Sequence, residues 1–493
     1  MYLLGYDIGS SSIKAALVDV ESGTQVAVAQ QPKVEMEMIA EQPGWAEQQP
    51  EEWWKHLCNA TRELLEMTGI DSSKIQGIGI AYQMHGLVML DANGQSIRPS
   101  IIWCDSRAVG IGNDAFTSLG EEQCLSHLLN SPGNFTASKL RWVQQYEPDK
   151  YAACDKIMLP GDYIAYKLSG EINTTISGLS EGMLWDFKEK RPANLLLDHY
   201  EVDETLLPEI RGTFAVHGQV SKKASHETGL IPGIPITYRA GDQPNNALSL
   251  NVLQPGEVAA TGGTSGVVYG VVDQPIYDPQ SRVNGFAHVN YTDENPLTGI
   301  LLCINGAGIQ YGWVRKQLTG SDTSYDMLES IAAKAPVGSD GLSILPFGNG
   351  AERMLGNREI GAHFVNIQLN RHERAHVYRA TLEGIAFSFV YGMQILGEMG
   401  MSIEVIKVGN DNLFLSNIFS ETIATLTDAK IEMLKTTGAV GAALAAGVGA
   451  EVFPDLSSAL AHVSLLQTIH PRADRPAFQE AYANWEHSLK RFL

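Results

Sequence analysis

The chain has 493 residues, of which 44% are hydrophobic and 18% charged, and its formal net charge is −21. A chain of this length is too long for one hydrophobic core, so we expect two large domains. The acidic balance argues against a nucleic-acid surface. It also means that a phosphorylated ligand needs local N–H groups and a cation. The 5 cysteines form no Cys-x-x-Cys pair, which favours a reducing compartment over a zinc or disulfide scaffold.

The first residues and the apolar runs predict a cytoplasmic protein with no membrane partner. Met1-Tyr-Leu-Leu-Gly-Tyr-Asp7 leads directly into a strand pattern and lacks the basic start and apolar centre of a signal peptide. No apolar run reaches the length of a membrane-spanning helix, because charged residues or glycine-rich turns interrupt each candidate.

Taken in chain order, the predicted elements alternate between strands and helices. In the first half, hydrophobic periodicity predicts strands at 2–8, 13–20, 75–82 and 87–90 and helices at 51–68, 138–146 and 161–168. In the second half, it predicts a strand–turn–strand unit at 256–270, strands at 300–305 and 405–408, and helices at 306–318, 374–399, 413–426 and 438–449. The pattern alone therefore indicates two α/β domains that divide near residue 250.

Two turns of small and hydroxyl residues are typical of phosphate binding. The first is Asp7-Ile-Gly-Ser-Ser-Ser-Ile-Lys14, and the second is Ala260-Thr-Gly-Gly-Thr-Ser-Gly266. Their backbone N–H groups can approach a phosphate because no large side chain blocks them. An acid accompanies each turn: Asp7 in the first and Asp242, after a glycine, ahead of the second. The two units predict an enzyme that handles ATP, with a helix N-cap as the alternative role of Asp242.

Over nearly its whole length the chain resembles the FGGY family of carbohydrate kinases. The resemblance rests on the order and spacing of motifs at 7–10, 44–48, 53–54, 83–86, 103–107, 138–142, 241–243, 261–265, 379–386 and 438–443. It implies two ribonuclease-H-like, actin-like ATPase domains, 1–249 for the sugar and the first phosphate turn and 250–493 for the nucleotide. The active site is expected in the cleft between them.

The resemblance also implies roles for individual residues. Asp242 resembles the family's general base, and Asp7 resembles the residue that holds Mg²⁺ through water. The residues implied to bind the sugar are Met84, His85, Trp103, Asp105 and Gln243. The structural alternatives are a histidine with only protein partners, and a buried tryptophan beside an Asp105–Arg107 pair.

The resemblance implies an ATP site made by both halves of the chain. Its expected members are Ser10, Ser11, Lys14, Gly262, Gly263, Thr264, Gly306, Gln310, Gly409, Asn410 and Asn412. Relatives usually carry a run of glycines where this chain has Gly409-Asn-Asp-Asn412. Asparagine tolerates left-handed geometry and can hydrogen-bond adenine or ribose. Residues 439–446 resemble a hinge helix, and a solvated strand lysine is the alternative for Lys14.

The implied activity is Mg²⁺- and ATP-dependent phosphorylation of a ketopentose. D-xylulose, phosphorylated at its 5-hydroxyl, is the first choice of substrate, because Met84-His85 resembles the sugar-contact pair of xylulokinases. The alternatives are a kinase for another ketose or a polyol, such as ribulose or a hexulose, and a non-catalytic actin-like ATP-binding module. The expected partners are a small sugar and ATP, with no nucleic acid and no membrane, and a homodimer is possible.

Overall fold

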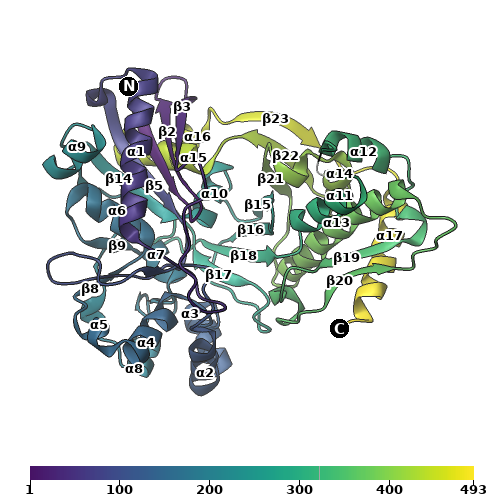
Figure 1. Cartoon of the computed structure of the whole chain (residues 1–493), viewed down its shortest axis with the longest axis horizontal. Helices are drawn as coiled ribbons and strands as arrows, with labels where there is room; N and C mark the ends of the chain where they lie inside the picture. Colours follow the sequence, from purple (N-terminus) through teal and green to yellow (C-terminus); the bar gives the residue numbers. More distant parts are fainter. Residues whose placement is uncertain (321) are drawn as a thin grey trace.

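The computed structural model describes residues 1–320 and 322–493. Two lobes lie side by side along the long axis of the molecule (Figure 1). The first is built on a six-stranded sheet with the order β13-β14-β5-β1-β2-β3, and the second on a seven-stranded sheet with the order β17-β18-β16-β15-β21-β22-β23. The two mixed sheets with their helices confirm the predicted α/β class.

The first sheet brings three loops to one edge. Its strands are β1 (Tyr2–Ile8), β2 (Ile13–Asp19), β3 (Gln25–Gln31), β5 (Ile75–Tyr82), β13 (Gly218–Gln219) and β14 (Pro235–Gly241). β1 and β2 form the predicted hairpin, and β1 and β14 both run parallel to β5. Because the carboxyl ends of parallel strands meet at one edge of a sheet, the residues that follow β1, β5 and β14 come together there.

The second sheet repeats this arrangement. Its strands are β15 (Glu257–Gly262), β16 (Gly266–Val272), β17 (Asn284–Ala287), β18 (Thr298–Ile304), β21 (Val405–Gly409), β22 (Lys430–Lys435) and β23 (Ser464–Ile469). β15 and β16 form a hairpin around the second small-residue turn, and β15, β21 and β22 are parallel. Gly262 and Gly409, which end β15 and β21, therefore lie at the same edge.

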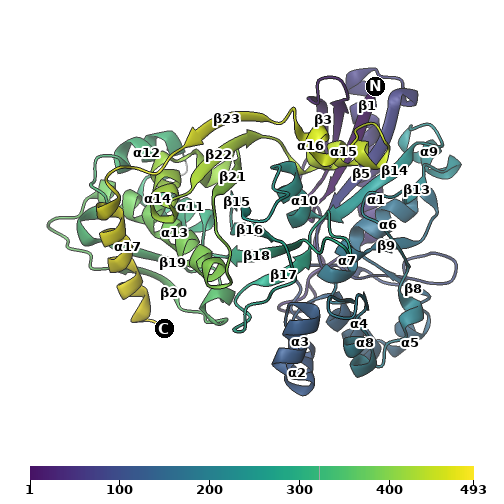
Figure 2. The same ribbon diagram turned by 180° about the vertical axis from the view of Figure 1, so that it is seen from behind.

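Helices cover the first sheet on both faces. The first lobe contains α1 (Pro50–Thr68), α2 (Val109–Leu119), α3 (Glu121–Leu128), α4 (Thr136–Tyr146), α5 (Pro148–Ala152), α6 (Pro160–Ser169), α7 (Ile176–Glu181), α8 (Asn194–Tyr200), α9 (Lys222–Thr228), α10 (Asp242–Ser249) and α16 (Leu456–Leu460). α1 buries Trp53, Leu57 and Leu64 and ends at Gly69, whose φ of 63° is left-handed, as the sequence predicts. Figure 2 shows α15 (Gly438–Gly449) packed against the first sheet, although it comes from the second half of the chain.

Two glycines in the first sheet explain how closely α15 approaches. A Cβ on Gly5 would overlap the backbone of Ala439, and a Cβ on Gly79 would overlap the backbone of Ala442. The small residues of α15 are buried on nearly every side. The first lobe therefore includes a helix that the sequence places beyond residue 250.

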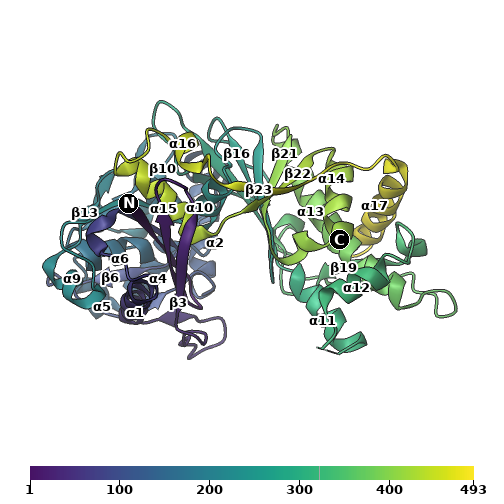
Figure 3. The same ribbon diagram turned by 90° about the horizontal axis from the view of Figure 1, so that it is seen from above.

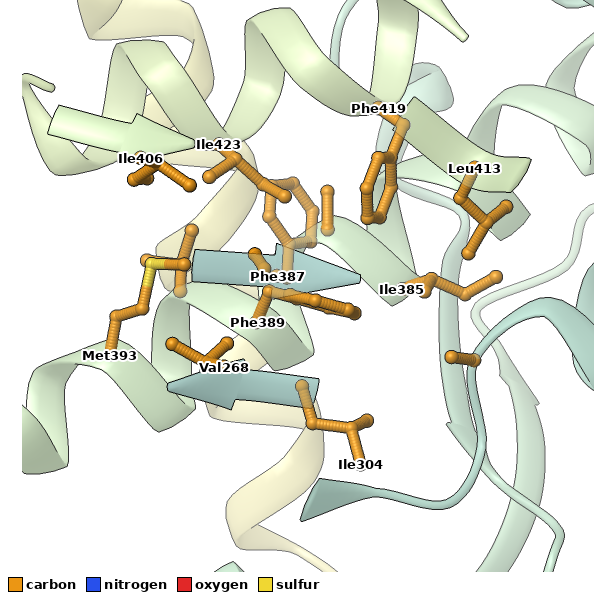
Figure 4. Packing of buried hydrophobic residues seen from close by; sticks show 14 of the residues in the cluster. Val268, Ile304, Ile385, Phe387, Phe389, Met393, Ile406, Leu413, Phe419 and Ile423 are labelled. Atoms are coloured by element: carbon orange, nitrogen blue, oxygen red, sulfur yellow. The ribbon is translucent and has the colours of Figure 1, made fainter. Parts of the chain in front are cut away.

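The second lobe has its core around one long helix. Its helices are α11 (Gly308–Leu318), α12 (Tyr325–Ala332), α13 (Arg374–Glu398), α14 (Asn417–Thr427) and α17 (Arg475–Lys490), beside the hairpin of β19 (Ser343–Phe347) and β20 (Gly361–Val365). Figure 4 shows Phe389 of α13 between Val268 of β16 and Phe419 of α14. The predicted helix at 413–426 is wrong in one respect. It is split at Ser416, whose hydroxyl accepts the Phe419 N–H and starts α14.

The two lobes are joined through β17 and through the chain that follows α15. The hydroxyl of Ser177 donates to the carbonyl of Ala287 at 3.2 Å, and the N–H of Ala287 donates to the hydroxyl of Ser180 at 3.0 Å. Figure 3 shows the chain passing from α16, beside α15, along β23 to α17 in the second lobe.

Further short strands lie outside the two sheets: β4 (Glu47–Gln48), β6 (Val88–Leu90), β7 (Ser100–Ile101), β8 (Lys156–Met158), β9 (Asn173–Thr175), β10 (Trp185–Asp186), β11 (Arg191–Pro192) and β12 (Glu209–Arg211). In the part of the chain that is described, no helix is both long and apolar enough to cross a bilayer.

Candidate active site

The two predicted acids lie at the shared edge of the first sheet. Asp7 of β1 and Ala240 of β14 are both register partners of Ala81 of β5, and Asp242 begins α10 just beyond β14. The side-chain amide of Asn245 in α10 donates to the carbonyl of Gly438 at 2.9 Å. A Cβ on Gly438 would lie 3.2 Å from the Asp7 carboxylate. Strand β1 and helices α10 and α15 therefore meet around Asp7.

The two acids influence each other's ionisation. Burial, followed by the charge of Asp7, raises the pKa of Asp242 to about 7. Burial also raises the pKa of Asp7, although Lys14 on the paired strand opposes this effect. A carboxyl group whose pKa lies near neutrality can take up a proton from a hydroxyl group and release it again.

His85 is held in one orientation beside these acids. Its Nδ1 lies 2.8 Å from the carbonyl oxygen of Glu181, and because a carbonyl only accepts, Nδ1 carries the proton. Burial and the nearby Lys139 lower the pKa of His85 to about 3, so the ring is neutral. The Nε2 atom is consequently an acceptor for a hydroxyl group. The ring packs edge-on against Phe135 at 4.7 Å and lies 5.5 Å from Phe286 of β17.

Met84 connects the histidine to Asp242, the predicted base. A Cβ on Gly241 would strike the Met84 side chain, so the side chain lies directly against the residue before Asp242. Gln243, next along α10, is partly exposed and hydrogen-bonds the Asp242 carboxylate, which lowers its pKa. The structure thus brings together four predicted residues: Met84, His85, Asp242 and Gln243.

Trp103 and Asp105 have different environments. The Trp103 side chain is 53% exposed, and its Nε1 lies 3.4 Å from the hydroxyl of Ser10 in the first turn. Asp105 is fully buried, where it accepts the Ala46 N–H at 2.6 Å and pairs with Arg107 at 2.7 Å. Its carboxylate oxygens are occupied by protein donors. This geometry favours the structural alternative for Asp105.

The Asp105–Arg107 pair belongs to a buried cluster of charged and aromatic residues next to the turn at 102–105. The Arg107 guanidinium lies 3.8 Å from the Trp45 ring centroid and 4.8 Å from that of Trp142, and it pairs with Glu47 at 2.6 Å. These residues explain the motifs at 44–48 and 138–142 as supports of the site.

Other residues of the 44–54 segment hold the first phosphate turn. The side-chain amide of Gln48 donates to the carbonyl of Ser10 at 2.7 Å, and its oxygen accepts the indole N–H of Trp53 at 3.0 Å. Ser11 and Lys14 are exposed. The turn therefore presents hydroxyl groups and a cation from a fixed backbone.

Part of the predicted nucleotide site lines a cavity of about 690 Å³ in the second lobe. It is lined by Gly262, Gly263, Thr264, Gly308, Ile309, Tyr311, Gly312, Trp313, Lys316, Tyr325, Asp326, Glu329, Asn412, Leu413, Leu415 and Ser416. Four predicted residues are among them: Gly262, Gly263, Thr264 and Asn412. Asn412 has a φ of 56°, the left-handed geometry expected of an asparagine there.

The other predicted nucleotide contacts lie outside this lining. The N–H of Gly306 donates to Glu352 at 3.1 Å, and Gln310 is 7% exposed in α11. Gly409 is partly exposed and Asn410 is exposed at the end of β21. The N–H of Gly306 is therefore already used by a protein acceptor.

Sequence reasoning missed the aromatic side of the cavity. Tyr311, Trp313 and Tyr325 come from α11 and α12, and Leu415 follows the Asn412 turn. Trp313 and Leu415 remain 52% and 58% exposed although they are large and apolar. That exposure is a signal of a ligand surface, but it can be recognised only once the fold is known. Lys139 and Glu181 were also missed, because their contacts with His85 can be recognised only once the fold is known.

The donors near Asp7 fit a magnesium ion that arrives with a nucleotide. Among the described residues, no group of three or more His, Cys, Asp or Glu side chains is placed to hold a metal. Asp7 and Asp242 nevertheless supply carboxylates, and the buried Asn245 Oδ1 has no partner in the described chain. Mg²⁺ is commonly bound by one or two carboxylates together with waters and substrate phosphates.

Known proteins resemble this chain over nearly its whole length. A xylulose kinase of Staphylococcus xylosus is 27% identical over 92% of this chain and 92% of its own length. An L-xylulose/3-keto-L-gulonate kinase of Escherichia coli is 27% identical over 99% of this chain and 96% of its own. The crystal structure of xylulose kinase from Rhodospirillum rubrum superposes with a TM-score of 0.90 at 25% identity, covering 100% of this chain and 99% of that one.

The family models cover both lobes. The N-terminal domain of the FGGY family of carbohydrate kinases matches residues 2–249, and its C-terminal domain matches residues 258–450. The structure has two actin-like lobes, with two acids at the edge of the first sheet and a nucleotide-sized cavity in the second lobe. Because both family models match, this chain belongs to the FGGY family of carbohydrate kinases and is an enzyme of that class.

Proposed function

We propose that the protein transfers the γ-phosphoryl group of ATP to a hydroxyl group of a ketopentose, with D-xylulose and its 5-hydroxyl as the preferred acceptor. The observation that carries this proposal is the grouping of Met84, His85 and Asp242 at one edge of the first sheet. Relatives that cover nearly the whole chain are named xylulose kinases, which supports the same acceptor.

In the proposed reaction, His85 and Gln243 bind hydroxyl groups of the sugar and Met84 lies against its carbon chain. Asp242 takes the proton of the attacking hydroxyl group. The new bond joins that oxygen to the γ-phosphorus, the bond from the γ-phosphorus to the β,γ-bridging oxygen breaks, and ADP leaves. Direct contact between Asp105 and the sugar is not part of the proposal, because its carboxylate is occupied.

The nucleotide is proposed to bind with its adenosine in the cavity of the second lobe. Gly262, Gly263 and Thr264 face the phosphates, and Ser10, Ser11 and Lys14 approach them from the first lobe. Asp7 would hold Mg²⁺ through water, and the ion would screen the charge of the phosphates. The division of the chain near residue 250 follows the two sheets in this proposal, with α15 and α16 as the exceptions.

A panel of acceptors in a coupled ADP-release assay tests the acceptor. D-xylulose should give the highest kcat/KM, against L-xylulose, D-ribulose, D-fructose, gluconate and glycerol. Mass spectrometry and ³¹P NMR of the product should show one phosphate ester at the 5-position. A higher kcat/KM with another acceptor would replace D-xylulose in the proposal. ATP binding without transfer to any acceptor would instead support the non-catalytic module.

A further inference from the structure

Lys139 of α4 is a buried amine beside the proposed sugar site. Its side chain is 0% exposed, and its Nζ donates to the carbonyl of His85 at 2.8 Å and to the carbonyl of Ile102 at 2.9 Å. Within residues 1–320 and 322–493, no carboxylate lies within ion-pair distance of this amine. Burying an ammonium group without such a partner is costly, so its hydrogen bonds to the backbone need an explanation.

The first of these bonds stabilises an unusual backbone conformation. His85 has a φ of 62°, in the left-handed region that residues other than glycine seldom adopt. His85 lies in the turn after strand β5, and Lys139 gives its carbonyl a hydrogen-bond partner. In this conformation Nδ1 of the imidazole meets the Glu181 carbonyl. That bond places the proton on Nδ1 and leaves Nε2 as the acceptor.

The second bond stabilises the turn that carries Trp103. The carbonyl of Ile102 accepts the Asp105 N–H at 3.2 Å as well as the Lys139 amine. Trp103 follows directly and reaches the Ser10 hydroxyl. One amine therefore joins the segment that presents His85 to the segment that presents Trp103.

The surroundings of Lys139 are mixed in charge. The ionisable groups that influence its pKa are those of Asp105, Cys104, Arg107 and Glu181, and its own charge lowers the pKa of His85. Burial lowers the pKa of Lys139 to about 7. The amine retains at least two N–H donors in either protonation state, so both backbone bonds are kept.

We propose that Lys139 is a positioning residue for the acceptor sugar: it aligns His85 and Trp103 as one sugar-binding surface without touching the sugar. This inference rests on the proposed sugar-kinase function. It predicts that Lys139 contributes to sugar affinity through His85, whereas a residue needed only for folding would contribute to stability alone.

The test compares Lys139→Met with Lys407→Met. Lys407 is the control because it is a buried lysine of the second lobe, 7% exposed, that also donates to a backbone carbonyl, that of Asn251; unlike Lys139, it also pairs with a carboxylate, that of Glu257. Both variants should lower Tm. Lys139→Met should raise KM for the sugar at least about tenfold and leave KM for ATP within about twofold, since only the sugar surface is disturbed. Lys407→Met should leave both KM values within about twofold.

A double-mutant cycle with His85→Ala tests the route of the effect. If Lys139 acts through His85, the second substitution adds little to the sugar KM of the first. If Lys139→Met does not fold, Lys139→Gln, which keeps one donor, takes its place with a smaller expected increase. An unchanged sugar KM, an equal increase in Lys407→Met, or fully additive effects in the cycle would overturn the proposal.

Failure of this inference can be told apart from failure of the proposed function. The wild-type acceptor panel decides whether the protein phosphorylates a sugar and which one. Lys139→Met and Lys407→Met are then compared with the wild type on the sugar that the wild type uses. Kinetics give KM for that sugar, and calorimetric titration without nucleotide gives its affinity. A wild type with no acceptor would overturn the proposed function and this inference together.

Discussion

The Nδ1 atom of His85 lies 2.8 Å from the carbonyl oxygen of Glu181 at the end of α7, so the side chain proposed to bind the sugar is oriented by the backbone of a helix. The neutral ring offers Nε2 as an acceptor. A neighbour in sequence, Met84, lies against the glycine that precedes Asp242. The groups proposed to bind the sugar and to accept its proton are thus linked through strands β5 and β14.

Replacing His85 tests the sugar contact. His85→Ala should raise KM for the acceptor sugar by roughly 10- to 100-fold, because it removes one hydrogen bond and an aromatic wall. KM for ATP should stay nearly unchanged, since both phosphate turns are untouched. Steady-state kinetics with each substrate varied in turn measure this, with exposed His226→Ala as the control. Parallel increases in both KM values would assign His85 a structural role.

Replacing the proposed base separates chemistry from binding. Asp242→Asn should lower kcat by about 10²- to 10⁴-fold, the range for loss of a general base. Sugar binding should remain measurable by calorimetry, because the amide keeps the shape of the side chain. The exposed Asp114→Asn variant on α2 serves as a control. Near wild-type turnover in Asp242→Asn would remove this residue from the catalytic role.

An exposed leucine tests the nucleotide cavity. Leu415 is 58% exposed and lines the cavity, so adenosine should cover it. Leu415→Ser should raise KM for ATP by about fivefold, as expected for losing roughly 1 kcal/mol of apolar burial. KM for the sugar should not change. Leu369→Ser, at a leucine 90% exposed and outside the cavity, should have no effect on either KM.

Two buried histidines predict a loss of stability in mild acid. Burial lowers the pKa of His217 to about 3 and that of His288 to about 4, whereas an unfolded histidine has a pKa near 6.5. Below about pH 6.5 the unfolded chain binds protons that the native state does not. Each of the two histidines should therefore contribute a decrease in the free energy of unfolding as pH falls, by up to about 1.4 kcal/mol per pH unit, which opposes the contribution of buried carboxyl groups with a raised pKa such as Asp242.

Urea denaturation between pH 7.5 and 5 measures this slope. The slope of the free energy of unfolding against pH should be smaller for His288→Gln than for the wild type, and His226→Gln, at an exposed histidine, should leave it unchanged. A slope equal in the wild type and in His288→Gln would show that His288 does not contribute.

Binding of both substrates should draw the two lobes together. The turn at 9–12 belongs to the first lobe and Gly262–Thr264 to the second, so both can contact one ATP only when the lobes approach each other. Closure would also keep water from ATP until the sugar is bound. We expect low ATPase activity without sugar.

Small-angle scattering measures the closure. The radius of gyration should decrease when sugar and a non-hydrolysable ATP analogue are both present. An unchanged value in the free, sugar-bound and doubly bound states would exclude a large movement of the lobes. A smaller movement around Gly348–Asn357 would then be sought.

The sequence alone determined the local elements and the chemistry of single turns. The hairpin at 2–8 and 13–19, the helix at 438–449 and the catalytic-type acid after β14 could be predicted, because periodicity, glycine punctuation and short motifs are local. Even the break at Ser416 has a local cause, its N-cap, which the uninterrupted apolar pattern of 413–426 concealed.

Only the tertiary structure decided what these elements meet. That α15 packs on the first sheet depends on Gly5 and Gly79, more than 350 residues away in a chain of 493. That Asp105 is fully buried and paired, and that Lys139 reaches the His85 carbonyl, depends on α4 packing against the turn at 102–105. The aromatic wall of the nucleotide cavity comes from α11 and α12, far from the Asn412 turn that it faces. Such contacts leave no periodic signal, because they arise from packing between segments that are distant in the chain.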